Sequence, residues 1–173
     1  MQMYVLSGPS FTGLTLHFQA GKLYQGQRAT LSLDIIVMGC GLGGLTAAYC
    51  LAQADHKVTI LEAAPTIGEI GAGIQMGPNL TRRLIRLCLG KCLAVKPEGL
   101  VFERWFAGET VAWSMRGDTM EEEYGAPCYH IHRSDFHRMV LELAEPHRTI
   151  RMNCRVFSMD TSKPTLTLES GKV

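Results

Sequence analysis

The chain has 173 residues, of which 46% are hydrophobic and 19% are charged, and its formal net charge is +1 at pH 7. That length suits one sizeable hydrophobic core, and the near-neutral charge gives no electrostatic reason to expect nucleic-acid binding. No apolar run approaches the roughly 20 residues of a membrane-spanning helix, and six cysteines in apolar surroundings suit a reduced, cytoplasmic protein.

Residues 1–33 are rich in Gly, Ser, Thr and Gln. They lack the basic segment followed by a sustained apolar core that marks a secretory signal. We interpret them as an N-terminal arm outside the folded region, either flexible or the product of a misassigned reading frame.

The stretch from residue 34 to residue 62 carries the strongest pattern in the chain. An apolar run at 35–38 leads into a glycine-rich turn at 39–44, helical spacing follows through 45–52, and a second β-branched run at 58–61 ends in Glu62. Strand, glycine turn, helix, strand and acid form the order of a dinucleotide-binding βαβ unit. The pattern predicts an α/β, Rossmann-like fold in which the two strands pair in parallel.

Each residue of this pattern has a physical role. Gly39 permits a tight turn, Gly41 removes the Cβ that would keep a pyrophosphate from the backbone, and Gly44 lets the helix lie close to the strand. The helix N-terminus offers N–H groups to phosphates, and Glu62 can accept hydrogen bonds from ribose hydroxyls. An acid at this place also argues against NADP. The alternative is a βαβ crossover whose glycines serve packing alone.

Residues 68–79 contain four glycines and a single charge, Glu69, so the backbone itself is the expected contact surface of a loop. Asn79 is the predicted N-cap of a following helix. Its apolar positions and its basic positions fall on different sides of that helix: Leu80, Leu84, Leu87 and Cys88 on one, and Arg82, Arg83 and Arg86 on the other.

Arg133 falls between a short predicted strand, 129–132, and a helix that opens at Ser134. The helix should turn one apolar face to the core, namely Phe136, Met139, Val140, Leu143 and Ala144. Farther on, 149–159 and 165–169 are predicted strands joined by a turn at 160–164, which gives a C-terminal β-hairpin.

The histidines raise the question of a metal site. His130 and His132 alternate along one strand, and His137 follows one helical turn later. A zinc site requires a closed set of ligands at fixed spacing, and the chain has no C-x-x-C pair. We therefore expect no metal site.

Several ordered segments resemble the group A FAD-dependent (flavoprotein) monooxygenases of the salicylate-hydroxylase type. The segments lie at 68–79, 104–109, 124–127 and 132–137, the last reading His-Arg-Ser-Asp-Phe-His. The resemblance runs from about residue 34 to residue 173. It implies that 34–173 is a partial, truncated FAD-binding domain of the glutathione-reductase/aromatic-hydroxylase type, whereas 1–33 lies outside the family pattern.

The resemblance also implies a chemistry. NAD(P)H reduces FAD, and the reduced flavin uses O2 to hydroxylate a small aromatic substrate. It makes Arg133 a contact of FAD, for which the alternative is a surface ion pair with Asp135 or Glu142. The implied cofactor contacts are Gly39, Gly41, Gly44, Glu62, Ala72, Gly73, Ile74 and Arg133. No catalytic residue can be named.

Two other functions stay open. One is a noncatalytic remnant that binds a nucleotide or a companion chain, and the other is a different Rossmann enzyme, such as an NAD-dependent oxidoreductase. The chain ends before the family's substrate-pocket segments, so we expect no hydroxylation by this polypeptide alone. We also expect strand 165–169 and the apolar face of helix 134–146 to lack part of their cover, which favours association.

Overall fold

The computed structural model describes residues 28–68, 71–87, 94–160, 162 and 165–171. These residues fall into two compact units. Among the described residues, the sheet unit comprises 28–68, 71, 136–160, 162 and 165–171, and the hairpin unit comprises 72–87 and 94–135. The described part of the predicted N-terminal arm, residues 28–33, is attached to the sheet unit, because Ala29 N–H donates to Ala54 O and Ser32 Oγ donates to Asp55 O.

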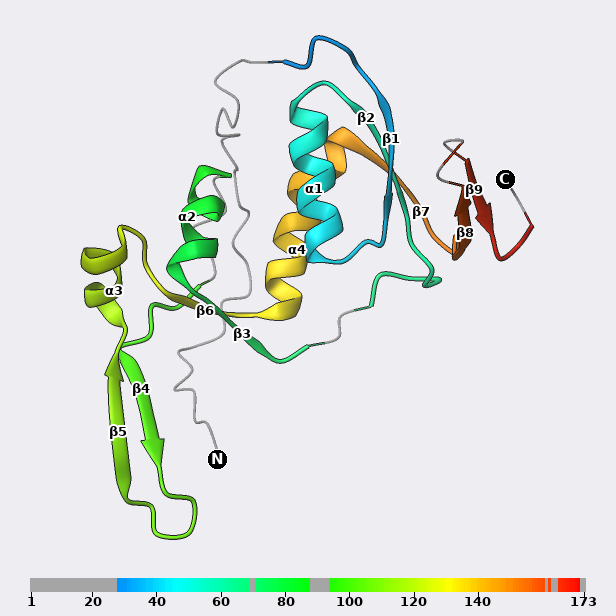
Figure 1. The fold of residues 1–173 in the computed structure, drawn as a ribbon. Coiled ribbons are helices and arrows are strands. Elements are labelled where there is room, and N and C mark those ends of the chain that lie inside the picture. The colour runs from blue at the N-terminus through cyan, green and yellow to red at the C-terminus, as the bar shows by residue number, and fades with distance from the viewer. Residues whose placement is uncertain (1–27, 69–70, 88–93, 161, 163–164, 172–173) are drawn as a thin grey trace. The chain divides into compact units, whose positions relative to one another are not determined.

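The sheet unit is built on a three-stranded parallel sheet of order β1-β2-β7 (Figure 1). Ile35 pairs with Val58 and Met38 with Leu61, so the predicted parallel pairing across the glycine turn is confirmed. Its elements are β1 (Asp34–Met38), α1 (Leu42–Gln53), β2 (Lys57–Leu61) and β7 (Arg148–Arg151).

The central position of β2 explains where the core of this unit lies. Val58, Ile60 and Leu61 are buried, whereas no residue of the edge strand β1 is fully buried. Helix α1 packs on all three strands and buries Leu45, Ala48 and Tyr49. Apolar residues at helical spacing therefore meet a β-branched central strand, as the sequence pattern predicts.

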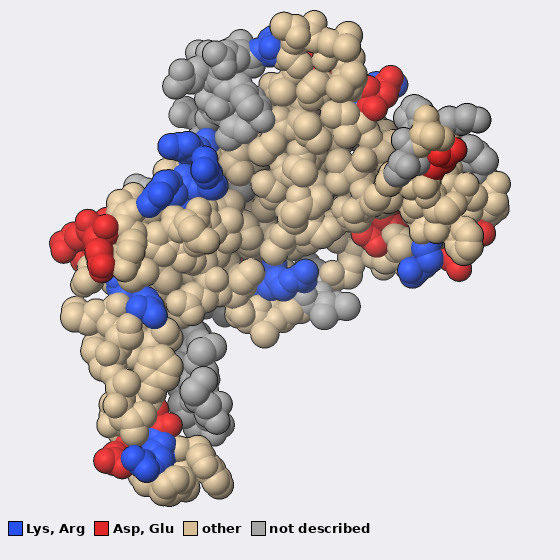
Figure 2. Space-filling model, in the orientation of Figure 1, with Lys and Arg blue, Asp and Glu red and all other residues tan. Residues whose placement is uncertain are grey.

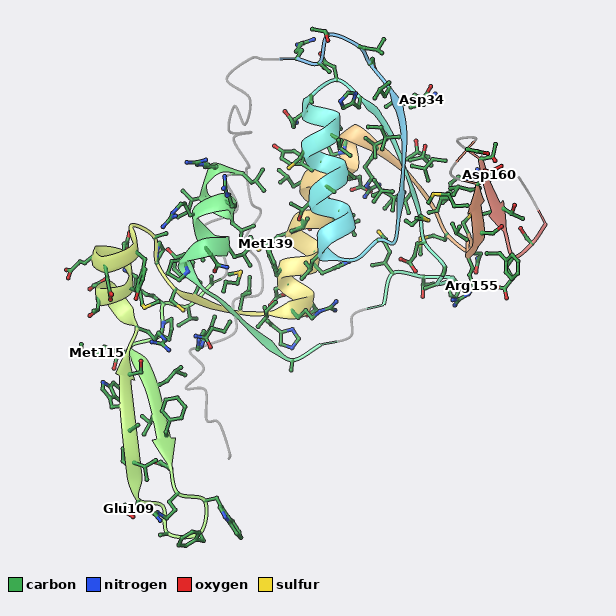
Figure 3. The ribbon with its side chains drawn as sticks, viewed as in Figure 1. Asp34, Glu109, Met115, Met139, Arg155 and Asp160 are labelled. Carbon is green, nitrogen blue, oxygen red and sulfur yellow. The ribbon has the colours of Figure 1, made fainter. Side chains whose placement is uncertain are left out.

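Helix α4 (Arg133–Ala144) follows β6 (Tyr129–His132) without a break and ends in the short turn η1 (Glu145–His147). Its predicted core positions are confirmed, since all of them are buried; Met139, labelled in Figure 3, is 2% exposed. The expectation that this apolar face lacks cover is therefore wrong. Exposed apolar side chains occur elsewhere, on a strand pair of the hairpin unit.

The C-terminal hairpin is present, but the predicted strand 149–159 is wrong as a single element. It divides into β7, which pairs with β2, and β8 (Val156–Asp160), which pairs antiparallel with β9 (Thr165–Leu168). The break has a physical cause. Asn153 adopts φ +54°, and Cys154 N–H donates to Glu62 O, which turns the chain away from the sheet.

In the turn after β8, Asp160 Oδ1 accepts hydrogen bonds from the backbone N–H and hydroxyl of Ser162 at 2.9 and 2.6 Å. The other residues of the predicted 160–164 turn lie outside the described ones. Leu168 packs with Leu61 and Cys154, so the hairpin contributes a small apolar cluster at the end of β2.

The hairpin unit contains two antiparallel strand pairs, β3 with β6 and β4 with β5. The expectation of a loop across 68–79 is wrong for its second half, since β3 occupies residues 73–76 and pairs with β6. The further elements are β3 (Gly73–Met76), α2 (Pro78–Arg86), β4 (Gly99–Glu103), β5 (Thr110–Met115) and α3 (Gly117–Tyr124).

Helix α2 begins at Pro78 with Gly77 as N-cap, so the prediction of Asn79 as the cap is wrong. Proline is favoured at the first helical position because its missing N–H costs nothing there. Leu80 is exposed and Thr81 is buried in its place. Leu84 and Leu87 are buried as expected, and the three arginines are solvent-exposed; Cys88 lies outside the described residues.

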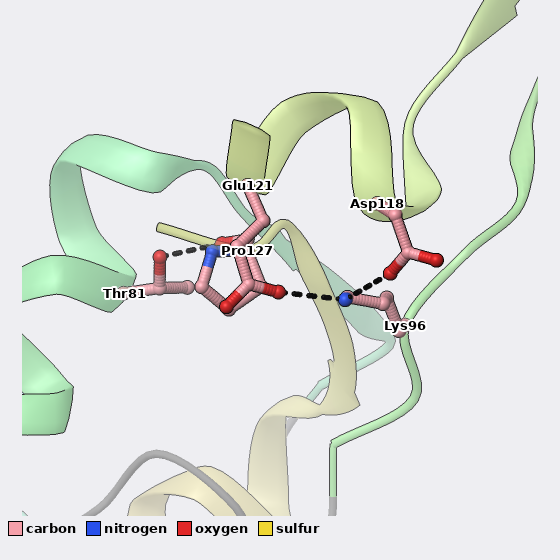
Figure 4. A network of polar contacts seen from close by, with 5 residues as sticks. All are labelled: Thr81, Lys96, Asp118, Glu121 and Pro127. Carbon is pink, nitrogen blue, oxygen red and sulfur yellow. Dashed lines mark hydrogen bonds and ion pairs between the residues drawn. The ribbon is translucent and has the colours of Figure 1, made fainter. Parts of the chain in front are cut away.

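Thr81 is buried because a tertiary hydrogen bond satisfies its hydroxyl. Its Oγ1 donates to Pro127 O at 2.6 Å, as Figure 4 shows. Nearby, Lys96 Nζ lies 2.6 Å from Asp118 Oδ1 and 2.7 Å from Glu121 Oε2, which ties the segment before β4 to α3. The hydrogen bonds from Lys96 to these two carboxylates raise the pKa of its ammonium group.

On the face drawn in Figure 2, basic and acidic side chains form small separate groups among other residues. Six exposed apolar side chains of the hairpin unit lie on β4, β5 and the turn between them: Val101, Trp105, Phe106, Val111, Trp113 and Met115. Among the described residues, no helix has the length and apolar character required to cross a bilayer.

Candidate cofactor site

The glycine turn of the sheet unit has the geometry that its sequence predicts. Gly39 adopts φ +99°, a conformation that favours glycine, and its N–H donates to Leu61 O at 2.8 Å. A Cβ on Gly44 would lie 2.0 Å from Gly39 O, so only glycine permits this approach of helix and strand. A Cβ on Gly41 would meet no atom within 4 Å, so the space beside that residue is open.

Helix α1 begins directly after this open space. Its N-cap is Gly41 in an extended conformation, and no acidic residue lies in its first turn. The first N–H groups of a helix have no intrahelical acceptor, and the helix dipole places partial positive charge there. The turn therefore presents backbone donors without a carboxylate of its own helix to compete for them.

Glu62 lies at the end of β2 and reaches back to the turn. Its Oε2 accepts from Cys40 N–H at 2.7 Å, and its Oε1 accepts from Ala64 N–H at 2.8 Å. The backbone N–H groups of Ala64 and Cys40 lower the pKa of the Glu62 carboxyl, so it is held in its charged form. Each carboxylate oxygen has two lone pairs, so further donors can still be accepted.

One side chain that contacts the turn was not predicted as part of the site. His137 Nε2 lies 2.7 Å from Cys40 O, although the two residues are 97 positions apart. Because a carbonyl oxygen only accepts, Nε2 carries the hydrogen of this bond. The one sequence signal is the spacing of His137 from Arg133, four residues on the same helix, which places both on one face.

The remaining predicted contacts belong to the hairpin unit. Gly73 pairs with His132 and Ile74 with Ile131, where β3 meets β6. Ala72 O accepts from Arg133 N–H at 3.0 Å, so the start of α4 is fixed beside the start of β3. The structure thus brings Gly39, Gly41, Gly44 and Glu62 together in one unit, and Ala72, Gly73, Ile74 and Arg133 together in the other.

The side chains considered as metal ligands or nucleophiles have other surroundings. His132 Nδ1 lies 2.5 Å from Ser134 Oγ, and burial lowers the pKa of His130. Among the residues that the structure describes, no group of three or more His, Cys, Asp or Glu side chains is placed to hold a metal ion. Cys40 is 4% exposed, and burial raises the pKa of its thiol, which disfavours a nucleophilic thiolate.

Comparison with known proteins places these features in a family context. Residues 23–86 match the model of the Thi4 family, a stretch that contains the whole βαβ unit. The chain is 41% identical over 115 residues to 3-amino-4-hydroxybenzoate 2-monooxygenase PtmB3 of Streptomyces platensis, a match that covers 65% of this chain and 29% of the relative. It is 35% identical over 134 residues to FAD-dependent monooxygenase OpS4 of Beauveria bassiana, covering 75% of this chain and 31% of that protein.

The fold gives the same result. The tetrameric form of 2-methyl-3-hydroxypyridine-5-carboxylic acid oxygenase superposes with a TM-score of 0.68 and 26% identity, covering 83% of this chain and 37% of that one. The match thus covers 29–31% of the length of these two relatives and 37% of the solved structure. In sequence and in fold, this polypeptide is similar to one part of proteins named as FAD-dependent or aromatic monooxygenases.

Proposed function

We propose that this chain holds the adenosine and pyrophosphate end of FAD, as part of a monooxygenase fold that hydroxylates a small aromatic molecule with NAD(P)H as reductant. The observation that carries the proposal is the glycine turn with its acid. Gly41 faces open space at the N-terminus of α1, and the charged Glu62 is fixed beside it. A ligand with both phosphates and ribose hydroxyls matches this set of donors and acceptors.

The residues present fit such a cofactor. The backbone N–H groups at the start of α1 would hold the pyrophosphate, and Glu62 would accept from ribose hydroxyls. Ala72, Gly73, Ile74 and Arg133 are proposed as its contacts in the hairpin unit. When bound, FAD supplies the redox chemistry that the side chains lack, and the protein orients it and excludes water.

The substrate is proposed at the level of a class. The names of the relatives specify hydroxylated or amino-substituted benzoates and a hydroxynicotinate. We infer a substituted aromatic acid, and the described residues give no reason to choose one member. The described cysteines Cys40, Cys50, Cys128 and Cys154 are free thiols, which supports a cytoplasmic location.

The test is a binding experiment on the 173-residue chain. Binding of FAD to the chain should quench or shift the fluorescence of the flavin. ADP should compete with FAD, and FMN should compete poorly because it lacks the adenosine half. The Glu62→Ala variant should bind FAD more weakly, by about 1.5–3 kcal/mol if a charge-assisted ribose contact is lost. Equal titration curves for the two proteins would contradict the role of Glu62.

The alternatives give different results in the same experiment. An NAD-dependent oxidoreductase would bind NAD more tightly than FAD, and would reduce it in the presence of a substrate. A remnant that binds only a companion chain would bind neither nucleotide. Binding of NADP in preference to NAD would contradict the position assigned to the acid, because a 2′-phosphate would meet a negative charge.

A further inference from the structure

Two side chains fix consecutive peptide groups at the tip of the glycine turn. Glu62 Oε2 accepts the N–H of Cys40, which belongs to the Gly39–Cys40 peptide. His137 Nε2 donates to the carbonyl of Cys40, which belongs to the Cys40–Gly41 peptide. One partner is at the end of β2 and the other is on α4, so the orientation of the turn depends on parts of the chain far apart in sequence.

The second of these bonds decides where the Gly41 N–H points. In a trans peptide the C=O and the following N–H point in opposite directions. Because His137 holds the Cys40 carbonyl, the Gly41 N–H is turned away from α4. Gly41 is exposed, and no atom lies within 4 Å of the place where its Cβ would be, so the residue borders open space in which a ligand could meet this donor.

We propose that His137 is a positioning residue, which orients the Gly41 N–H toward the pyrophosphate of the bound dinucleotide. It acts through the backbone of the turn and touches no part of the ligand. The inference rests on the proposed function for the identity of the ligand. The hydrogen bond that orients the Cys40–Gly41 peptide does not depend on the identity of the ligand.

Histidine suits this role for two reasons. Its ring is half-buried and places Nε2 at 2.7 Å from the Cys40 carbonyl oxygen. Both the neutral ring with hydrogen on Nε2 and the imidazolium ion can donate. The role therefore requires no particular charge on the ring.

The test uses two substitutions of His137, to glutamine and to asparagine, that differ in how far their amide nitrogen reaches from the backbone. The amide nitrogen of glutamine can occupy the place of Nε2, whereas that of asparagine corresponds to Nδ1 and falls short. FAD and ADP should bind His137→Asn about 3- to 10-fold more weakly than wild type, as expected for one neutral hydrogen bond, and His137→Gln within about 2-fold. Met139→Ala, a core change on the same helix, controls for general loosening.

A second measurement needs no ligand. Amide hydrogen exchange of the peptide covering residues 39–45 should be faster in His137→Asn than in either wild type or His137→Gln. Met139→Ala should accelerate exchange across α4 without this selectivity. Long-range nitrogen NMR of the unaltered protein should find hydrogen on Nε2 of His137, which keeps the proposal testable even if a variant fails to fold.

The outcomes separate the two proposals. If neither FAD nor ADP binds wild type while the exchange pattern is as described, the proposed function fails and the orientation of the turn stands. If wild type binds FAD and the asparagine variant binds equally well, the positioning role is overturned. A neutral ring with hydrogen only on Nδ1 would overturn it as well.

Discussion

Replacing Gly44 by alanine should separate helix α1 from strand β1. The added Cβ would lie 2.0 Å from Gly39 O and 3.1 Å from Gly39 C, whereas real Cβ atoms essentially never approach closer than 3.0 Å. The obstructing atoms are backbone, so no side chain can rotate away. The helix must therefore retreat by roughly 1 Å, a gap that forfeits a quarter to a half of each affected dispersion contact.

The neighbouring residue provides a matched control. Gly43 lies in the same first turn of α1, and a Cβ there would meet nothing within 4 Å. Both substitutions gain about 0.5–1 kcal/mol from the lower flexibility of alanine in a helix. Only Gly44→Ala incurs the steric cost, about 1–3 kcal/mol for overpacking. The difference between the two variants isolates the contact of helix and strand.

Thermal unfolding followed by circular dichroism measures that difference. For a chain of this size, 1 kcal/mol corresponds to about 2–4 °C in melting temperature. Gly44→Ala should therefore melt about 2–12 °C below Gly43→Ala, and Gly43→Ala should melt at or above wild type. Equal melting temperatures for the two variants would show that the close approach of helix and turn is not a feature of the folded protein.

Three other predictions concern stability and association. The pKa of Glu62 is lowered in the folded protein, so the charged carboxylate stabilises the fold above about pH 4.5, and this stabilisation is lost as the pH falls through the pKa of the folded state. The excess of wild type over Glu62→Gln in free energy of unfolding should therefore shrink when unfolding is measured at decreasing pH. Thr81→Val leaves the buried Pro127 carbonyl without its donor, and denaturant unfolding should show a loss of about 1–3 kcal/mol, whereas no change would refute the hydrogen bond. The exposed apolar face of β5 should promote self-association, so Trp113→Thr combined with Met115→Thr should lower the sedimentation-average mass at high concentration; an unaltered mass would locate the contact elsewhere.

The βαβ unit could be predicted because its signals are local. Strand periodicity, the glycines and the helical spacing all fall within residues 34–62, and each dictates its own conformation. The core face of α4 could be predicted for the same reason. In both elements, the residues that repeat at the right spacing are the ones that the structure buries.

The errors arose where a distant partner decides the outcome. Whether residues 149–159 form one strand depends on β2 and β9, which pair with different halves of the segment. Thr81 is buried in place of Leu80 because its acceptor, Pro127 O, comes from 46 residues away. No local pattern contains that information, so an apolar-face prediction based on α2 alone placed the wrong residue inside.

Contacts with distant residues also give Glu62 a second role. Its position after β2 matches a ribose-binding acid, yet both of its oxygens accept backbone N–H groups, one from Cys40 in the glycine turn and one from Ala64 in the segment after β2. The acid thus has a structural role that a nucleotide-free protein would also need. A weaker FAD affinity in Glu62→Ala does not by itself separate a lost ribose contact from a disordered turn.

A thermodynamic cycle that varies both the ligand and residue 62 separates a lost ribose contact from a disordered turn. ADP and 2′-deoxy-ADP share the phosphates that the turn binds and differ in one ribose hydroxyl. If Glu62 accepts from that hydroxyl, wild type should prefer ADP by about 1.5–3 kcal/mol, measured by calorimetry, and Glu62→Gln should lose most of the preference. If wild type and variant discriminate equally, the loss of affinity comes from the turn alone. The acid would then be part of the scaffold that presents the Gly41 N–H, and specificity for the ribose would have to come from another residue.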